Sequence, residues 1–361
     1  MSFWDKIADI FNFVPTILIT ILLFGILIFV HELGHYIAAR AFGVGVDEFS
    51  LGMGPKIFSI KGKYNPFTVR WLPIGGYVSM IGETDEEQDP ERAKVALNRK
   101  PRWQRCIVML AGVFMNFMLA FLVMFFIVVS SDRFASTKIA VFNDNATSNQ
   151  GPTDENRLMA DDEIIEVNGS RVYVYFDMAY KIMSDGIEPV DLVVKRGGRE
   201  VKLTDVVFPE TTSQGVLFGD IDFKVYGLEN NFKETLYQTF FQPLSIFRVT
   251  VGSLGDAISG RYGIQGVSGP VGITSQVGEA ASSGLAPLAS LLVMLSMSIA
   301  VFNLLPVPAL DGGRVLLLII ESIIRKPLPK KIENTAIAAS MALLLLLIFA
   351  VTVKDISGLF T

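Results

Sequence analysis

The segment His31-Glu32-Leu33-Gly34-His35 holds the residues best suited to chemistry in this 361-residue chain. It fits the pattern H-E-x-x-H, in which two histidines four residues apart share one face of a helix. Two imidazoles placed in this way can bind one zinc ion, and the adjacent glutamate can act as a general base toward water. The chain contains 2 histidines, and both lie in this segment. We therefore expect His31 and His35 to be zinc ligands and Glu32 to be the catalytic base.

A catalytic zinc usually has three protein ligands and one open position. Because the chain has no third histidine and only 1 cysteine, we expect the third ligand to be a carboxylate. The strongest candidate is Asp311, in the segment NLLPVPALDGG at residues 303–313. Its two prolines and two glycines break a helix, and irregular backbone at membrane depth is tolerated where it lines a cavity. The alternative is that Asp311 only caps a helix that starts at Gly312.

The composition favours a membrane protein, since 51% of the residues are hydrophobic, 19% are charged and the mean hydropathy is +0.46. Four stretches are long and apolar enough to span a bilayer. They are Pro15–Ala38, Ile107–Val129, Leu285–Leu305 and Ala336–Val353. The first is not interpreted as a cleaved signal peptide, because it runs directly into the H-E-x-x-H segment. A charged group at mid-bilayer costs about 2.5–3.5 kcal/mol, so polar residues at this depth indicate a shared function.

Lys and Arg residues are concentrated in the loop between the first two spans and in the loop between the last two. Positive charge marks the cytoplasmic side of a membrane protein. We therefore expect a multi-pass protein of the plasma membrane with the H-E-x-x-H and LDGG segments near the cytoplasmic side and both termini outside. The long segment between the second and third spans is also expected outside. The net charge of −5 gives no reason to expect a nucleic-acid partner, whereas the lipid bilayer is an expected one.

The expected fold is a membrane α-helical protein with four transmembrane helices, a membrane-associated β-hairpin loop and an inserted small β-rich domain. The expected divisions are a first membrane core, the β-rich domain, a linker and a second membrane core, at residues 1–130, 131–210, 211–284 and 285–361.

Within the β-rich domain, strands are expected at Glu163–Gly169 and on both sides of the hairpin signal Gly197-Gly198, with a short helix at Phe176–Met183. The linker is expected to contain an amphipathic helix at about Phe232–Ile258, interrupted by Pro243, that lies in the outer membrane interface. The alternative is a helix that packs on the soluble domain.

Six segments together resemble the site-2 protease family, the M50-type intramembrane zinc metalloproteases, and within it the bacterial kind that regulates the sigma-E response. In order along the chain they are HELGH, FSLGMGPKIF, WLPIGGYVSM, AGVFMNF, SGPVGI and NLLPVPALDGG. The resemblance implies a catalytic core of His31, Glu32, His35 and Asp311 around one zinc ion. It also implies regulated intramembrane proteolysis of single-span membrane proteins that another protease has already trimmed. Anti-sigma factors and leftover signal peptides are such substrates.

The same resemblance implies three groups of substrate-binding residues. Gly52 and Gly54 would lie in a β-hairpin loop that dips into the membrane and handles substrate, or they could be simple turn glycines. Asn303 and Pro306 would hold substrate near the metal, although Asn303 could instead bond a neighbouring helix. Asn116 would support the transition state or form an interhelical hydrogen bond.

The segment LMADDEIIEVNG is similar to a block found in PDZ domains, and the chain length admits a single such domain. Asp161 stands where a glycine is usual, the loop at residues 143–157 is long, and no clear carboxylate-binding loop follows. Whether the domain binds a free C-terminus or acts as a size filter therefore stays open. Arg314 also replaces the histidine that follows DGG in many relatives.

Two other classes of function were weighed against proteolysis. A catalytically silent scaffold or PDZ-type binding module could have lost its general base, so the intact Glu32 argues against it. A transporter or channel also uses polar residues inside the membrane. Four spans without a sign of inverted repeats argue against that class, and a tightly bound zinc ion would exclude it.

Overall fold

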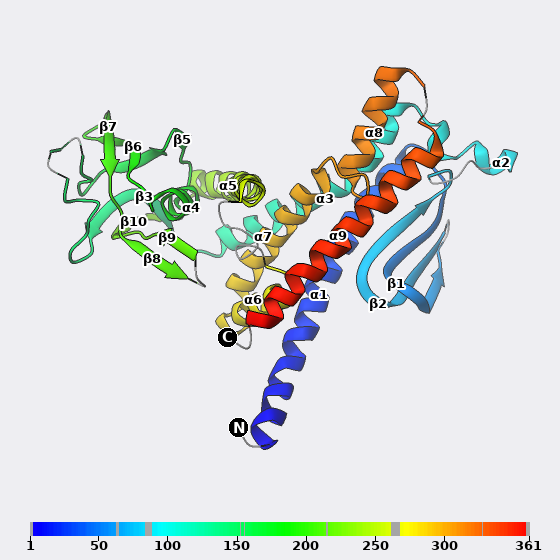
Figure 1. Cartoon of the computed structure of the whole chain (residues 1–361), viewed down its shortest axis with the longest axis horizontal. Coiled ribbons are helices and arrows are strands. Elements are labelled where there is room, and N and C mark those ends of the chain that lie inside the picture. The colour runs from blue at the N-terminus through cyan, green and yellow to red at the C-terminus, as the bar shows by residue number, and fades with distance from the viewer. Residues whose placement is uncertain are drawn as a thin grey trace. The chain divides into compact units, whose positions relative to one another are not determined.

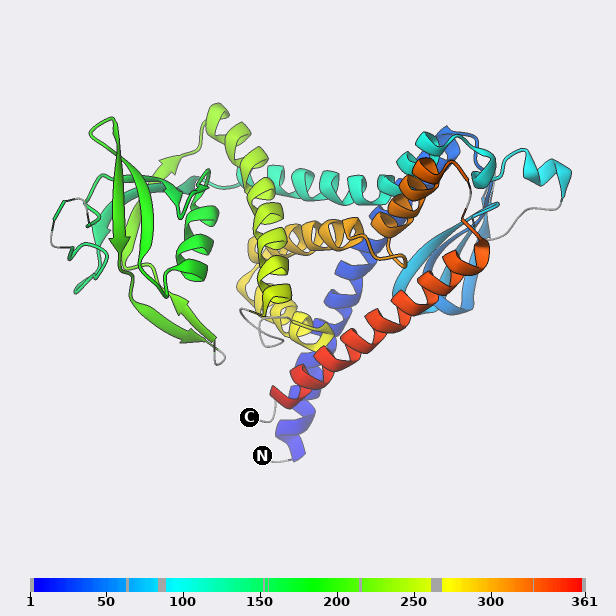
Figure 2. The same cartoon turned by 45° about the horizontal axis from the view of Figure 1, so that its top comes forward.

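The computed structural model describes residues 3–358, apart from residues 63–64, 84–88, 152, 155, 214–215, 261–267 and 327 (Figures 1 and 2). The chain forms two compact units. The helical unit comprises residues 1–120 and 268–361, and the β-rich unit comprises residues 121–267.

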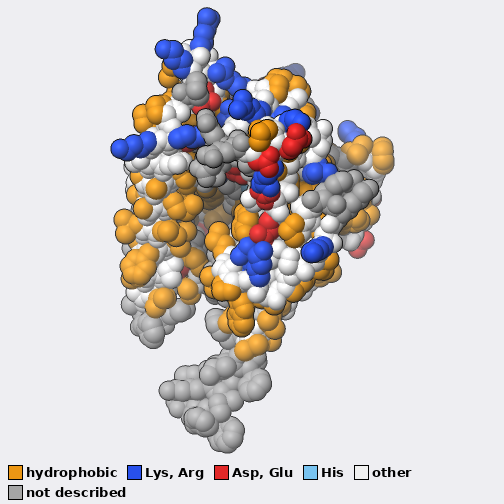
Figure 3. All heavy atoms as spheres, turned by 90° about the vertical axis from the view of Figure 1, so that its right-hand side faces the viewer, with side chains coloured by type: hydrophobic (Ala, Val, Ile, Leu, Met, Phe, Trp, Pro, Cys, Tyr) orange, Lys and Arg blue, Asp and Glu red, His pale blue; other side chains and the backbone are white. Residues whose placement is uncertain are grey.

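Among the residues that the structure describes, four helices have the length and composition needed to span a membrane, as the sequence predicted. The candidate spans are Val14–Ala41 within α1 (Phe3–Ala41), α3 (Arg102–Val129), α7 (Leu285–Leu304) and α9 (Lys330–Gly358). In the space-filling view, hydrophobic side chains cover much of the visible face, and many Lys and Arg side chains gather toward its top (Figure 3). The chain is therefore a multi-pass helical membrane protein with a β-rich insertion.

A shorter helix, α6 (Pro270–Ser283), was not predicted and packs inside the helical unit. Its Val277 is buried against Leu23 and Leu27 of α1, with apolar residues of α7 around them. The first turn of α6 is capped from α9, because the backbone N–H groups of Gly269 and Gly272 donate to Asp355 Oδ2 at 2.8 and 2.9 Å. This capping satisfies donors that a helix start leaves free.

The expected break after the third span is confirmed. Helix α7 ends at Leu304, and α8 (Asp311–Ile324) begins after a short turn. The two glycines at the start of α8 permit this tight return, because a Cβ at Gly313 would lie 2.0 Å from Val307 O. A Cβ at Gly312 would lie 2.3 Å from Leu304 O. Larger residues would therefore push the first turn of α8 away from the end of α7.

Two long bent strands, β1 (Val46–Lys61) and β2 (Pro66–Met80), form an antiparallel sheet beside the C-terminal half of α1 (Figures 1 and 2). Residues 49–51 of β1 pair with residues 76–78 of β2 and also with residues 67–69. The bend that makes this possible contains Gly52, whose φ is +86° and whose Cβ would lie 2.5 Å from Leu72 O. Only glycine fits there. The short helices α2 (Pro90–Ala93) and η1 (Leu97–Arg99) follow.

The β-rich unit is built on a sheet with the order β10-β3-β4-β6-β7, in which β5 pairs with β4. The strands of this sheet are β3 (Arg133–Phe142), β4 (Glu163–Val167), β5 (Ser170–Arg171), β6 (Val190–Arg196), β7 (Arg199–Val206) and β10 (Phe223–Glu229). Two further strands, β8 (Glu210–Ser213) and β9 (Val216–Gly219), form a separate hairpin. Helix α4 (Tyr175–Asp185) covers the core through Met178 and Ile182, which are both fully buried.

Local signals in the β-rich unit predicted its hairpin and its short helix correctly. Gly197 and Gly198 have φ values of +57° and +82°, which suit a two-residue turn between β6 and β7. The expected limit at residue 210 leaves out β10, which pairs with β3 from Phe223 opposite Phe142 to Glu229 opposite Arg133. Asp161 adopts a φ of +70°, a conformation that explains why glycine is usual at its position.

Helix α5 (Phe232–Ser259) continues through Pro243, so the expected interruption there does not occur. The helix packs on α4, where Ser245 Oγ donates to Asp177 Oδ2 at 2.8 Å and Tyr180 and Ser253 share a hydrogen bond of 2.6 Å. Tyr237 Oη donates to Tyr173 O at 3.0 Å. The alternative expectation, a helix that packs on the soluble domain, therefore describes one face of α5.

Asp162 and Arg196 form the buried ion pair that ties β6 to the turn before β4. The Asp162 carboxylate is 0% exposed and accepts from Arg196 Nε and Nη2 at 2.8 and 2.7 Å. The hydrogen bond to Asp162 also holds the pKa of Arg196 above its usual value.

We expect Asp162→Ala to lower the free energy of unfolding of the β-rich unit by about 3–5 kcal/mol, because it leaves the Arg196 charge without its partner. Pulse proteolysis of the full chain in detergent would measure this loss. Asp154→Ala is the matched control, since its carboxylate forms an exposed ion pair with Arg157 and acts on Arg196 only as a nearby charge. Equal stability of the two variants would contradict the prediction.

Candidate metal centre

Three side-chain atoms from the two ends of the chain converge in the helical unit. His31 Nε2 and His35 Nε2, both from α1, lie 3.2 Å apart. Asp311 Oδ2, from the first residue of α8, lies 3.1 Å from the first and 3.3 Å from the second. Zinc bonds of 2.0–2.1 Å at tetrahedral angles put ligand atoms about 3.3 Å apart. The spacing of the three atoms therefore matches one face of a zinc tetrahedron.

The Asp311 carboxylate lies next to the two imidazoles, at the place where a third metal ligand would be needed. Oδ2 is buried and has no hydrogen-bond partner among the residues that the structure describes. A buried oxygen without a donor is costly, and a metal ion at this point would remove the cost. The alternative that Asp311 only caps α8 is not supported, because the first turn of α8 has no side-chain cap in the described structure.

Each histidine is oriented by a contact on the side of the ring away from the three converging atoms. His35 Nδ1 donates to Val108 O of α3 at 2.8 Å, which leaves the Nε2 lone pair free for a metal. Partners of this kind fix the tautomer and the ring orientation of metal-bound histidines.

Asn116 on α3 contacts the Nδ1 side of the His31 ring, as Val108 O does for His35. Its amide Nδ2 lies 3.3 Å from His31 Nδ1, and its Oδ1 is buried without a partner in the described structure. Rotating the amide by half a turn places Oδ1 against Nδ1, so that His31 Nδ1 donates to Asn116 Oδ1. The rotation satisfies the buried oxygen and frees His31 Nε2 for a metal. Ser296 Oγ of α7 donates to the backbone carbonyl of Asn116 at 2.8 Å, which fixes this part of α3 against α7.

Two glycines let α1 and α3 approach closely enough for these contacts. A Cβ at Gly34 of α1 would lie 2.3 Å from Ala111 O. A Cβ at Gly112 of α3 would lie 2.4 Å from His35 Nε2 and 2.8 Å from His31 Nε2. Small residues at helix contacts are common in membranes, because they let backbones touch. Here the missing side chain of Gly112 leaves room for the two imidazoles.

A cavity of about 230 Å³ opens beside the three converging atoms. Glu32 and Asn303 line it, together with residues of the β2 segment Gly76–Met80. This segment passes close to α1, since a Cβ at Gly76 would lie 3.2 Å from Glu32 Cγ. The cavity therefore brings a glutamate, two histidines, an aspartate and a strand to one space.

The structure places the other expected substrate-binding residues differently. Gly52 and Gly54 lie at the bend of the β1–β2 sheet, outside the lining of this cavity, and both have a positive φ. Asn303 lines the cavity, and its Nδ2 donates to Ile299 O at 3.1 Å within α7. Pro306 is exposed in the turn before α8. Asn116 lies behind His31.

Sequence reasoning missed Gly112, although it stands in the segment AGVFMNF that carried part of the family resemblance. A glycine within a span predicts a close helix contact, but the sequence does not indicate which group makes that contact. It also missed Tyr77 and Val78, which line the cavity from β2.

We expect Gly112→Ala to weaken zinc binding by about 10–100-fold, the range for disturbing groups around metal ligands, because the new methyl group occupies the space of His35 Nε2. Zinc content would be measured in the purified chain against a graded chelator. Gly25→Ala is the control, since a Cβ at Gly25 of α1 meets no atom within 4 Å. Undiminished zinc affinity in Gly112→Ala would show that the helices can separate without cost.

Comparison with known proteins places this chain in a family. The model described as Peptidase family M50 matches residues 19–347. A provisionally named zinc metalloprotease of Fusobacterium nucleatum is 37% identical over 348 residues, which are 96% of this chain and 99% of that protein. The zinc metalloprotease RasP of Bacillus licheniformis is 29% identical, with 96% and 99% covered. The regulator of sigma-W protease RasP of Bacillus subtilis is 27% identical, with 96% and 100% covered. The chain therefore belongs to peptidase family M50 and is a zinc metalloprotease of the site-2 type.

Proposed function

We propose that this protease hydrolyses peptide bonds in or near the transmembrane segments of other membrane proteins, with its zinc held by His31, His35 and Asp311. The observation that carries the proposal is the convergence of their Nε2 and Oδ2 atoms to within 3.1–3.3 Å, in a cavity that Glu32 also lines. The histidines belong to a helix with the length and composition of a membrane span.

Glu32 is the proposed general base. Zinc held by the three ligands supplies a Lewis acid that makes an attacking water more acidic near neutral pH. Glu32 takes a proton from that water and returns it to the amine that leaves when the peptide bond breaks. Asn116 and Val108 O keep the imidazoles in the orientation that binding requires.

Substrate must unwind before it can be cut, because a helix in lipid shields its peptide groups by its own hydrogen bonds. We propose that the unwound segment lies along Gly76–Met80 of β2, which lines the cavity beside Glu32. Within the described residues, this segment pairs with β1 and with no other strand. An extended peptide can add to a free strand edge through main-chain hydrogen bonds. Asn303 lies across the same cavity and offers a side-chain amide to the peptide.

The proposed substrates are single-span membrane proteins that another protease has already shortened. A relative from Bacillus subtilis carries the name regulator of sigma-W protease, which makes anti-sigma factors the first class to test. Signal peptides left in the membrane are the second class, because they also offer one short apolar helix.

The proposed placement puts the metal site near the cytoplasmic face of the plasma membrane and the β-rich unit outside. It rests on the Lys and Arg residues that flank the spans, which favour the cytoplasmic side. The loop between α1 and α3 carries many of these Lys and Arg residues, and a second, smaller group lies in and after α8.

The outer half of the β1–β2 sheet is proposed to lie in lipid. All residues from Met53 to Lys61 are exposed in the structure. Ile57 and Phe58 are 54% and 51% exposed, although neighbours on a strand point to opposite faces. Trp71 is 68% exposed. A sheet with large apolar side chains on both faces is poorly suited to water and well suited to a bilayer.

We propose that the β-rich unit is PDZ-like and acts as a size filter for substrates. Its six-stranded sheet with α4 on the core supports the PDZ-like assignment. Gly219 of β9 packs on the end of α4, where a Cβ would lie 2.4 Å from Ile182 O and 2.8 Å from Gly186 Cα. The β8–β9 hairpin therefore occupies the surface next to the end of α4, which argues against a bound C-terminus there.

The outward face of α5 is the proposed contact of this unit with the outer membrane interface. Its exposed apolar residues recur at helical spacing. They are Phe232, Leu236, Phe240, Val251 and Ile258.

We expect Glu32→Gln to lower the cleavage rate of a trimmed single-span substrate by about 100-fold or more, while zinc stays bound, because the general base is lost. Cleavage would be followed in liposomes, with zinc measured in the same samples. Glu91→Gln, at an exposed position on α2, is the control and should cleave like the wild type. Equal cleavage by Glu32→Gln and the wild type would remove Glu32 from the mechanism.

We expect Trp71 fluorescence to be quenched by brominated lipids and protected from iodide in water, because its side chain would face the bilayer. The measurement uses a chain in which Trp4 and Trp103 are replaced by Phe. A control chain in which only Trp103 remains reports a residue at the start of α3. Quenching of Trp71 by iodide and not by the lipids would place the sheet in water.

A further inference from the structure

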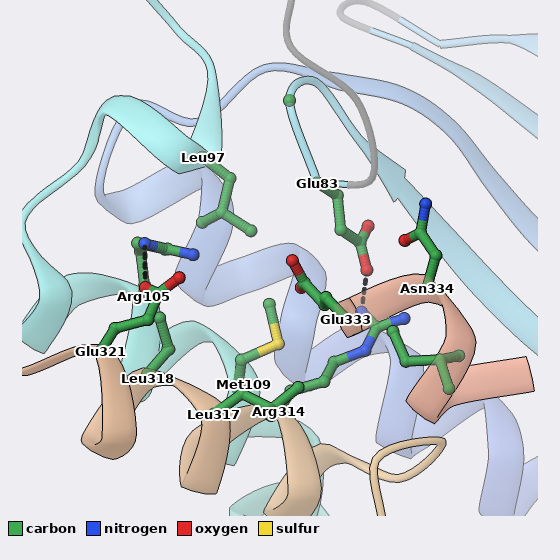
Figure 4. Close-up of a pocket in the computed structure, with 12 residues that line it drawn as sticks. Glu83, Leu97, Arg105, Met109, Arg314, Leu317, Leu318, Glu321, Glu333 and Asn334 are labelled. Atoms are coloured by element: carbon green, nitrogen blue, oxygen red, sulfur yellow. Dashed lines mark hydrogen bonds and ion pairs between the residues drawn. The ribbon is translucent and has the colours of Figure 1, made fainter. Parts of the chain in front are cut away.

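We propose that the ion pair between Arg314 and Glu83 is a latch that holds the end of β2 against α8 and so positions the strand segment Gly76–Met80 beside the metal ligands. Both residues are thus positioning residues. The inference rests on the proposed function, since it assigns to the strand a role in holding substrate. Arg314 Nη1 donates directly to Glu83 Oε1 (Figure 4).

Each partner is connected by one short step to a part of the site. Arg314 follows Asp311 by three residues on α8, so the two side chains lie on one side of that helix. Glu83 follows β2 by three residues, and its backbone N–H donates to Met80 O at 3.2 Å. The second carboxylate oxygen of Glu83 accepts from Met80 N at 3.4 Å. The ion pair therefore connects a metal ligand to the last residue of the strand.

The pair is partly buried. The side chains of Arg314 and Glu83 are 33% and 16% exposed. Both line the metal cavity, and both also line a smaller cavity of about 50 Å³ under the first turn of α9. Figure 4 shows the smaller cavity, with Glu83 and Arg314 directed toward one another and joined by a dashed line. An ion pair so placed is partly shielded from salt and water, and its loss leaves a partly buried charge unpaired.

The latch acts on a part of the site that has few other polar connections. Between α8 and the segment from β2 to Glu83, the described residues show one ion pair, that of Arg314 with Glu83. Val315 adds an apolar contact at the edge of the cluster that contains Val78 and Met80. Apolar packing allows sliding, whereas a hydrogen-bonded ion pair fixes direction and distance. The pair therefore decides how closely the strand edge approaches Asp311.

The test compares Arg314→Gln, Glu83→Gln and the double variant in the full zinc-loaded chain. Hydrogen–deuterium exchange of the peptide covering residues 76–83 reports whether the strand is released, without any need for cleavage. Cleavage of the trimmed single-span substrate reports the consequence as kcat and KM. We expect faster exchange in all three variants and a fall in kcat/KM of about 10–100-fold, because a displaced strand misplaces the peptide bond. The double variant should match the single ones, and zinc content should stay unchanged.

Arg92→Gln is the matched control. It breaks the Arg92–Asp47 pair, which joins α2 to β1 at 2.8 Å but is exposed and lies outside the lining of the metal cavity. Arg314→Lys keeps the charge and should recover part of the wild-type kcat/KM. It also guards against a failure of Arg314→Gln to fold.

Three results would overturn the latch. Exchange of residues 76–83 that stays at the wild-type rate in both single variants would show that the strand needs no such connection. Effects that multiply in the double variant would show that the two residues act separately. Loss of cleavage in Arg314→Gln with a normal Glu83→Gln would make Arg314 a group that acts on substrate directly. If the wild type cleaves nothing, the proposed function fails, and the exchange measurement still decides the latch.

Discussion

A single metal ion requires its ligand atoms to meet within a few ångströms, and the proposed ligands here come from α1 and α8. The atoms of His31, His35 and Asp311 lie within this range, and close contact of the α1 and α3 backbones leaves room for the two imidazoles. Gly34 brings α1 against α3, and Gly112 leaves the space that the imidazoles occupy. In lipid there is no hydrophobic force to press helices together, so close van der Waals contact of small residues has to do so.

The same close approach decides how buried polar groups find partners. A polar atom inside a membrane span is costly unless it is bonded, so each one constrains its neighbours. Val108 O accepts a hydrogen bond from His35 Nδ1, and the Asn116 side chain faces His31. Ser296 of α7 donates a hydrogen bond to the backbone carbonyl of Asn116. These bonds connect α1, α3 and α7 around the ligand atoms. The arrangement of the histidines therefore depends on the packing of the spans, and the packing of the spans depends on these hydrogen bonds.

The β1–β2 sheet brings main-chain hydrogen-bonding groups to the metal cavity, which helices alone could not supply. A helix uses its own N–H and C=O groups, whereas a strand edge leaves alternate groups free. The segment Gly76–Met80 lines the cavity, and glycine at position 76 allows it to lie against Glu32. The Arg314–Glu83 pair then connects this strand to the helix that carries Asp311. The proposed general base, the proposed ligand Asp311 and a strand edge are thus held together.

The sequence by itself determined the parts of this protein whose physics is local. Apolar runs of sufficient length identified the four spans, and the spacing of His31 and His35 predicted that their rings lie together on one helix face. The motif around Asp311 predicted a third group near them, and Gly197-Gly198 indicated the hairpin in the β-rich unit. Each of these depends on neighbours within a few residues, on helix periodicity or on the thickness of a bilayer. The family resemblance added the order of the motifs and the reaction.

Only the tertiary structure decided which distant groups meet. It showed that Gly112 faces the imidazoles, that Asn116 lies behind His31, and that Gly76 rather than Gly52 or Gly54 lies beside Glu32. It showed that the β-rich sheet includes β10, a mostly exposed strand with a weak apolar pattern, and that one face of α5 packs against α4. It also paired Arg314 with Glu83. Such contacts join residues far apart in the chain, and their energy depends on the packing around them, which no local pattern records.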